Sequence, residues 1–174
     1  MSNSASIQIL RESFSLYAEV RCTMPQLLHM RKDAMKVCVG VRIEKDIGAV
    51  WQAWNNPDSV MEWHAASDDW YVTASQVELK IGGGFCHRMA AKDGSVSFDF
   101  TGTFVAIEAP NLLGYCMPDG RSVTVGFVSN LGTTYVTEIL DAESATSYEQ
   151  QRDGWQNILN NFKRHMEKQI KLAD

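Results

Sequence analysis

Residues 85–104, FCHRMAAKDGSVSFDFTGTF, decide the fold. Residue types alternate on both sides of the Asp93-Gly94 pair, which is a strong signal for a tight hairpin turn. Alternation with a period of two is typical of a β-strand with one buried face. The apolar face would carry Phe85, His87, Met89 and Ala91 before the turn, and Val96, Phe98, Phe100, Gly102 and Phe104 after it. The stretch therefore predicts a β-hairpin.

Further strands are predicted on both sides of this hairpin. Residues 37–43 alternate valine and isoleucine with other residues. Residues 71–81 alternate less regularly, which indicates a β-bulge near Ser75. Later strands are expected at residues 112–117, 123–127 and 133–140, separated by turns rich in proline, glycine and asparagine. Together these segments predict six or seven antiparallel strands.

Helices are predicted after the first strand and at the end of the chain. Asp46 is a suitable N-cap for a short helix that Asn56-Pro57 ends, and Pro57 can open a second short helix. Residues 147–171 predict one long helix. Its apolar stripe consists of Trp155, Ile158, Leu159, Phe162 and Met166. Antiparallel strands with a terminal helix predict an α+β domain, in which this stripe packs on one sheet face.

The chain divides into two parts. Residues 36–174 form the predicted domain, whereas residues 1–35 show little apolar periodicity and are expected to be a leader or extension. That segment could precede a start at Met35, or it could add a strand or helix to the domain. A mitochondrial presequence is a further alternative, but the acidic residues Glu12 and Glu19 count against it.

Composition excludes several classes of function. The chain has 174 residues, of which 45% are hydrophobic, and a net charge of −5. This fits one soluble domain and gives no support to nucleic-acid binding. No apolar run approaches the length of a membrane span. The four cysteines and four histidines lack metal-ligand spacing, so we expect free cysteines, no metal, no cofactor and a cytoplasmic location.

The order of elements resembles the helix-grip fold of the START-related (SRPBCC) superfamily, and more narrowly the family of activators of heat-shock protein 90 ATPase homologues. The resemblance covers residues 36–168. It rests on residues 50–54 (VWQAW), Asn56-Pro57, Trp63, Gly82-Gly83-Gly84, Asp93-Gly94, Gly102-Thr103, Glu108-Ala109-Pro110, Asp119-Gly120, Gly132-Thr133, and Gly154-Trp155 with Leu159.

The resemblance implies a curved sheet wrapped around the long C-terminal helix, with a cavity between them. It does not imply one chemistry, because such families include chaperone activators linked to stress response, small-molecule binders and cyclase-like or hydrolase-like proteins. The full co-chaperone carries a separate N-terminal chaperone-binding domain. Residues 1–35 are too short to supply that domain.

The predicted site is a hydrophobic cavity between the sheet and the long helix. We expect it to be bordered by Trp63, His87, Met89, Phe98, Phe100, Tyr115 and Trp155. Apolar walls with one imidazole favour recognition of a small molecule, since hydrolysis would need a nucleophile or base aimed at an oxyanion site. A hydrogen-bonded core histidine is the alternative interpretation of His87.

Other polar groups receive structural interpretations. His64, Asp68 and Asp69 could form an acid–base group, but a solvated loop is the favoured interpretation. Cys86 and His87 point to opposite strand faces, so they cannot form a nucleophile–base pair. Two arginines, Arg88 and Arg121, are expected to pair with Asp99 or Glu138 across the sheet surface.

The sequence thus predicts a non-catalytic domain that binds an apolar or aromatic small molecule and has no catalytic residue. Two alternatives remain open. One is a module that binds a chaperone or another protein, and the other is a cyclase-like or hydrolase-like enzyme that uses His87 or His64 on an aromatic or polyketide-like ligand. No nucleic acid or membrane partner is expected, and the chain could be a monomer or a homodimer.

Overall fold

A computed structural model describes residues 35–168. The predicted leader, apart from Met35, lies outside the described residues. The elements are β1 (Lys36–Ile43), α2 (Ile47–Asn55), α3 (Pro57–Trp63), β2 (Trp70–Val77), β3 (Gly84–Ala91), β4 (Ser97–Glu108), β5 (Leu112–Cys116), β6 (Ser122–Asn130), β7 (Thr133–Asp141) and α4 (Tyr148–Lys168). This order confirms the predicted α+β class.

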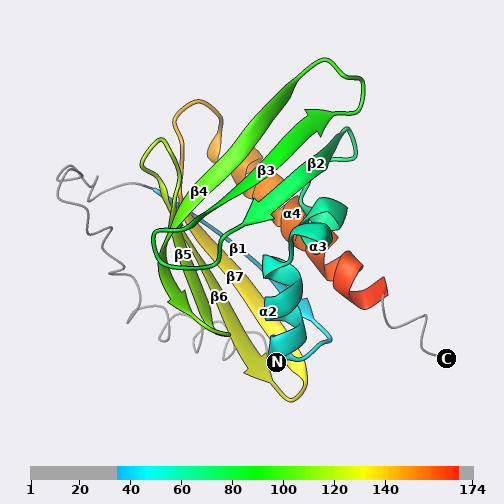
Figure 1. The fold of residues 1–174 in the computed structure, drawn as a ribbon, viewed down its shortest axis with the longest axis vertical. Coiled ribbons are helices and arrows are strands. Elements are labelled where there is room, and N and C mark those ends of the chain that lie inside the picture. The colour runs from blue at the N-terminus through cyan, green and yellow to red at the C-terminus, as the bar shows by residue number, and fades with distance from the viewer. Residues whose placement is uncertain (1–34, 169–174) are drawn as a thin grey trace.

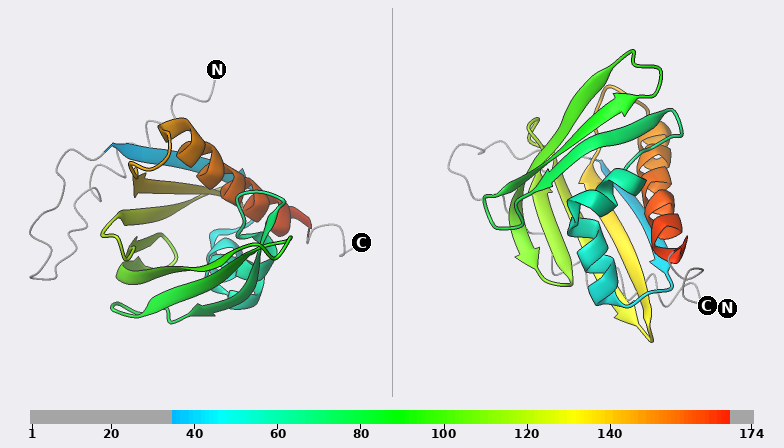
Figure 2. Two further views of the ribbon diagram at one scale, coloured as in Figure 1. Left: turned by 90° about the horizontal axis from the view of Figure 1, so that it is seen from above. Right: turned by 45° about the vertical axis from the view of Figure 1, so that its right-hand side comes forward.

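The strands form one curved sheet with the order β1-β7-β6-β5-β4-β3-β2, and every neighbouring pair is antiparallel. The curvature brings the β1 and β2 ends toward each other around the helices (Figures 1 and 2). The helix α4 packs on β1, α3 packs on β2, and α3 also contacts α4. The helices therefore close the concave side of the sheet, which is the expected helix-grip arrangement.

The short helices begin where side chains cap them. The Asp46 carboxylate accepts a hydrogen bond from the Ala49 backbone N–H at 3.0 Å. The Asn56 side chain caps α3 by accepting from the backbone N–H groups of Asp58 and Ser59, at 2.8 and 3.1 Å. These bonds satisfy amides that have no partner within the helix. The predicted breaks at Asp46 and Asn56-Pro57 are confirmed.

The apolar stripe of α4 enters the core as predicted. Leu159, Phe162 and Met166 are almost fully buried, and Trp155 and Ile158 pack against the same core. The sheet contributes buried residues from its concave face, among them Leu113, Val123, Phe127, Val136 and Leu140. None of the described helices is long and apolar enough to cross a membrane.

The strand expected at residues 71–81 differs from β2. It ends at Val77, because the chain turns over residues 78–83, where the Gly83 N–H bonds to the Lys80 carbonyl at 2.9 Å. The predicted bulge is present between Val72 and Ala74, next to Ser75. Apolar residues in the turn had extended the apparent period-two pattern beyond the strand.

Candidate functional site

A small cavity lies inside the helix grip. Its volume is about 30 Å³, which is room for about two water molecules. It is lined by Trp54, Asn55, Val60, Trp63, His64, Val77, Phe85, His87, Phe100, Phe104, Tyr115, Glu138 and Ile158. The walls therefore come from the short helices, the concave sheet face and α4, and aromatic rings fill most of the interior.

Four of the seven predicted cavity residues line this space: Trp63, His87, Phe100 and Tyr115. Trp155 lies behind the wall, with its ring edge-on to Phe100 at a centroid distance of 6.0 Å. The structure thus gathers these five side chains at one place. Whether they contact a ligand stays a prediction.

The other two predicted residues lie outside the cavity. Met89 is buried but lines no part of the cavity, and Phe98, its partner in the β3–β4 register, is 47% exposed. The Phe98 ring packs beside Trp70 instead, at a centroid distance of 5.5 Å. Alternation along β4 indicates the face of Phe98, but it does not indicate where the helices stop covering that face.

His87 is fixed in the cavity wall. Its Nδ1 lies 2.9 Å from the Ser75 hydroxyl, and its ring stacks on Phe85 at 4.9 Å. Burial lowers the pKa of His87 to about 4, because the charged imidazolium would lose its hydration. The imidazole is therefore neutral at neutral pH.

His64 departs from the solvated loop that the sequence suggested. Its ring stacks on Phe100 at 5.4 Å and lies 5.1 Å from the His87 ring, while Asp68 and Asp69 remain exposed. Burial, and secondarily the charge of His87, lowers the pKa of His64 to about 3. The buried Nδ1 atom has no hydrogen-bond partner among the described residues.

Glu138 is the residue that the sequence interpretation missed. It is 2% exposed, its Oε2 has no partner among residues 35–168, and burial raises its pKa to about 8. Burial and the nearby Glu138 also raise the pKa of Tyr115. Because its pKa is about 8, the Glu138 carboxyl group is mostly protonated at neutral pH. The sequence did indicate this burial, because Glu138 lies on the same strand face as the apolar residues Val136 and Leu140.

One of the two arginines expected to form surface ion pairs has its predicted partner. Arg88 pairs with Asp99 at 3.0 Å, as predicted. Arg121 does not reach Glu138, which points into the core; it contacts Asp119 at 2.7 Å and Glu143 at 3.6 Å instead.

Trp63 supplies the third polar atom without a partner. Its ring packs on Trp54 and Phe162, with centroid distances of 5.0 and 4.6 Å, while its Nε1–H has no acceptor among the described residues. Trp63 Nε1, His64 Nδ1 and Glu138 Oε2 thus belong to three residues that line one cavity. Native proteins contain a few such groups per hundred residues, and what distinguishes these three is that their residues line the same cavity.

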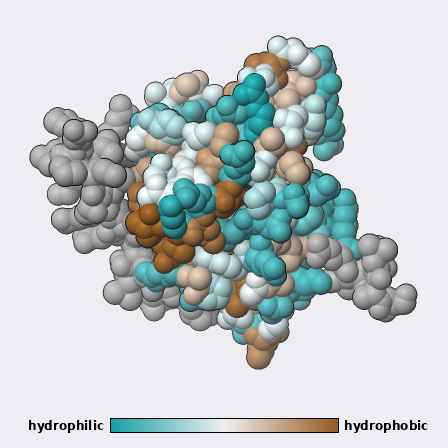
Figure 3. Space-filling view, in the orientation of Figure 1, coloured by the Kyte–Doolittle hydropathy of each residue, from teal (hydrophilic) through white to brown (hydrophobic). Residues whose placement is uncertain are grey.

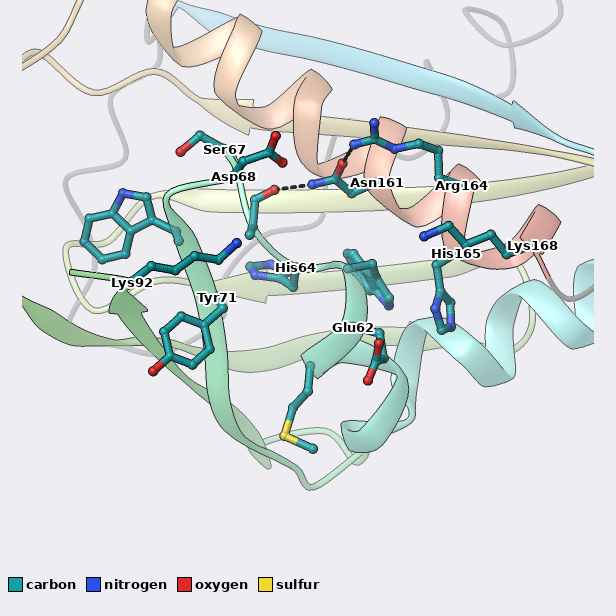
Figure 4. A pocket seen from close by; sticks show the side chains of 14 residues that line it. Glu62, His64, Ser67, Asp68, Tyr71, Lys92, Asn161, Arg164, His165 and Lys168 are labelled. Carbon is teal, nitrogen blue, oxygen red and sulfur yellow. Dashed lines mark hydrogen bonds between the residues drawn. The ribbon is translucent and has the colours of Figure 1, made fainter. Parts of the chain in front are cut away.

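A larger open groove adjoins the cavity. It measures about 680 Å³ and is lined by Met61, Glu62, Trp63, His64, Ala65, Ser67, Asp68, Trp70, Tyr71, Lys92, Asn161, Arg164, His165 and Lys168. We call this the outer groove; Figure 4 shows it from close by. Trp63 and His64 line both spaces, so they form the partition between them.

Known proteins share the sequence pattern and the fold of this chain. A family model described as "Activator of Hsp90 ATPase homolog 1-like protein" matches residues 46–167. The chain belongs to this family. The match begins just after β1 and extends through nearly all of α4.

Solved structures of similar proteins agree with the fold. The solution NMR structure of an AHSA1-like protein from Aeromonas hydrophila is 54% identical, with a TM-score of 0.73; the match covers 77% of this chain and 93% of that one. A protein from Cytophaga hutchinsonii is 41% identical over 80% of this chain and 96% of that one, with a TM-score of 0.68. At 14% identity, a protein from Nitrosomonas europaea shares the fold (TM-score 0.67, coverage 78% and 96%). No relative was found among curated proteins.

The chemistry available in this AHSA1-like chain follows from its protonation states. A neutral carboxyl group can donate and accept, a neutral imidazole can do either through its two nitrogens, and an indole N–H only donates. In residues 35–168 no three His, Cys, Asp or Glu side chains gather where they could hold a metal ion. The arrangement is suited to pairing with an uncharged polar group.

Proposed function

We propose that this AHSA1-like chain is a cytoplasmic, non-catalytic protein that binds a small apolar or aromatic molecule carrying an uncharged hydrogen-bonding group. One observation carries the proposal: the three buried polar atoms without a partner among the described residues belong to Trp63, His64 and Glu138, and all three residues line a single cavity. A ligand group that enters this cavity can accept from the indole N–H and exchange hydrogen bonds with the other two.

The buried polar atoms without partners affect the free energy of the site. Leaving a buried donor or acceptor without a partner costs about 1–3 kcal/mol. Three such atoms, on Trp63, His64 and Glu138, make the site costly wherever neither water nor a ligand pairs with them. Natural proteins keep such costs mainly where function requires them, and pairing with a ligand would recover part of this free energy.

The sizes of the two spaces support a division of the ligand between them. The cavity of about 30 Å³ accommodates a hydroxyl or carbonyl group but no aromatic ring. The outer groove, at about 680 Å³, lies within the range of ligand sites. The ligand body would therefore lie in the groove, with its polar group passing Trp63 and His64 into the cavity.

Catalysis is the weaker alternative. An imidazole with a pKa of about 3 or 4, as at His64 and His87, is a poor base at neutral pH. Glu138 is mostly protonated there and is equally poor as a base. The Ser75 hydroxyl contacts His87 but is not among the cavity-lining residues, so it could not attack a ligand there.

Protein binding is the second candidate, favoured by exposed apolar side chains. Leu79 and Ile81 are 39% and 62% exposed in the β2–β3 loop, and Val96 and Phe98 are 50% and 47% exposed at the β3–β4 turn. The β2–β3 loop and the β3–β4 turn lie at opposite ends of β3 (Figure 1). Hydrophobic residues on the face in Figure 3 likewise form separate patches rather than one docking surface.

A matched pair of compounds tests the proposed binding. Acetophenone and α-methylstyrene have nearly the same shape, but only acetophenone has a carbonyl oxygen that can accept from Trp63. We expect acetophenone to bind about five-fold more tightly in calorimetric titrations, as one hydrogen bond worth about 1 kcal/mol implies.

Two variants locate the effect. Trp63→Phe removes the N–H and should abolish the preference, whereas Trp51→Phe, at a core ring outside the cavity lining, should keep it. Equal affinities for the two compounds in the unmodified protein, or no binding of either, would refute the proposal.

A further inference from the structure

The outer groove carries a positive charge on a negatively charged protein. Three cations line it, Lys92, Arg164 and Lys168, against two carboxylates, Glu62 and Asp68. The whole chain has a net charge of −5. None of the three cations has a carboxylate within 4.0 Å among the described residues. With three cations against two carboxylates, the groove has a formal charge of +1, and its cations form no direct ion pair among the described residues.

The cations reach the groove from two elements. Lys92 follows β3, and its ammonium group extends toward His64, while Arg164 and Lys168 come from α4 on the opposite side (Figure 4). The Arg164 guanidinium donates to the Asn161 side-chain oxygen, a neutral acceptor. An anion held between these sides would lie above the partition that separates the groove from the cavity.

The acidic groups of the groove lie near its basic groups without forming ion pairs with them. Glu62 is near His165, whose ring also contacts the Ser59 hydroxyl at 3.0 Å. Burial lowers the pKa of His165, Lys168 lowers it further, and Glu62 opposes the shift. Asp68 lies on the loop before β2 and is exposed to solvent. Neither carboxylate pairs with a cation of the groove.

An apolar wall faces these cations. Met61 and Tyr71 are 36% and 44% exposed, and Trp63 and Trp70 complete the wall. These residues come from α3 and from the start of β2. Aromatic and thioether side chains beside cations suit a molecule that is apolar on one side and anionic on the other.

We propose that the outer groove binds an amphipathic organic anion, a carboxylate, sulfonate or phosphate, whose charged group contacts Lys92, Arg164 and Lys168 and whose apolar body contacts the aromatic wall. This rests on the proposed function, because it specifies the ligand whose polar group would enter the cavity. It adds that the ligand is acidic at its solvent-facing end.

The dipole of α4 explains only part of the positive charge in the outer groove. Cations in the last turns of a helix offset its dipole, which explains Arg164 and Lys168 at the end of α4. It does not explain Lys92, which lies in the turn after β3 and extends into the same groove.

Two dyes with one scaffold test the inference. The anion 8-anilinonaphthalene-1-sulfonate and the neutral N-phenyl-1-naphthylamine differ by the sulfonate, and both fluoresce on binding apolar sites. Substituting both Lys92→Gln and Lys168→Gln should weaken binding of the sulfonate about five-fold, the upper range for exposed charge pairs, and change binding of the neutral dye less than about two-fold.

Three controls sharpen the test. Glu62→Gln should strengthen sulfonate binding, Lys80→Gln on the distant β2–β3 loop should not alter it, and about 0.5 M salt should weaken only the sulfonate. Thermal denaturation checks that each variant folds. Equal changes for both dyes, or none for the sulfonate, would overturn this inference alone. If neither dye binds the unmodified protein, the proposed function fails as well.

Discussion

At the residue scale, Glu138 makes stability depend on pH. Its pKa is about 8 in the folded protein, against 4.5 as the ordinary value, so between these values the folded state holds a proton that the unfolded state has lost. Stability should therefore fall as pH rises through this range, by up to about 1.4 kcal/mol per pH unit from this group. Glu138→Gln should remove this slope, as measured by urea unfolding at several pH values.

The buried imidazoles supply a contribution of opposite sign. His64 and His87 have pKa values of about 3 and 4 in the folded protein, against 6.5 as the ordinary value. Below about pH 6.5 the unfolded state binds protons that the folded state does not, so stability falls as pH decreases. His64→Gln should reduce this acid-side loss and leave the alkaline slope of Glu138 unchanged. The two pH ranges overlap between about 4.5 and 6.5, so the variants differ at the ends: only Glu138→Gln should change the slope of stability above about pH 6.5, and only His64→Gln should change it below about pH 4.5. A change of slope above about pH 7 in His64→Gln, or none there in Glu138→Gln, would contradict the assigned protonation states.

Gly102 is required by close packing beside the cavity. A methyl group added there would lie 2.6 Å from the Phe85 ring and 2.9 Å from the Tyr115 ring, closer than carbon atoms approach. Because both rings are buried in the core, we expect Gly102→Ala to cost about 1–3 kcal/mol in urea unfolding.

The matched control is Gly154 in α4, where an added methyl group meets nothing within 4 Å. Gly154→Ala should stabilise the protein by up to about 1 kcal/mol through helix propensity. A neutral Gly102→Ala would mean that Phe85 and Tyr115 have room to move apart.

At the scale of elements, the grip of α4 on the sheet depends on its buried stripe. Phe162 is fully buried and contacts Trp54 and Trp63, whereas Trp155 is half-buried at the other end of the stripe. Phe162→Ala should cost about 3–5 kcal/mol in chemical denaturation, and Trp155→Ala should cost less. A loss below about 1 kcal/mol at Phe162 would contradict the packing of α4.

Periodicity explains which elements could be predicted from the sequence. Strand alternation and helical spacing report which residues share a face, so the sheet, the α4 stripe and the position of His87 were predictable. They do not report how far a helix covers that face, which is why Phe98 was assigned to the cavity although it is exposed. His64 follows α3 without a period of its own, and only the packing of α3 on β2 brings it inside.

At the scale of the whole molecule, residues 35–168 form one sheet and one core. The β1 and β2 ends of the sheet are joined through α4 and α3, and the family match begins at residue 46. We therefore expect a chain that starts at Met35 to keep nearly the same melting temperature as the full chain. A fall of more than about 8 °C, equivalent to several kcal/mol for a protein of this size, would make residues 1–34 an integral part of the fold.

The fold was more predictable than the site for the same physical reason. Fold follows from many residues that repeat one pattern, whereas the cavity depends on single polar residues at apolar positions. Glu138 is the main example, since its sequence context fits both a surface ion pair and a buried carboxyl group. Only the three-dimensional arrangement places Trp63, His64 and Glu138 around one space.

The central claim, that a ligand's polar group pairs with the Trp63 N–H, is tested most directly by NMR. The five tryptophans give separate indole N–H signals in a ¹H–¹⁵N spectrum, and Trp63→Phe identifies the signal of Trp63. We predict that acetophenone moves this signal, with saturation, more than it moves the other four, and more than α-methylstyrene does. A Trp63 signal that stays fixed while acetophenone saturates the protein, or that moves equally with both compounds, would contradict the claim.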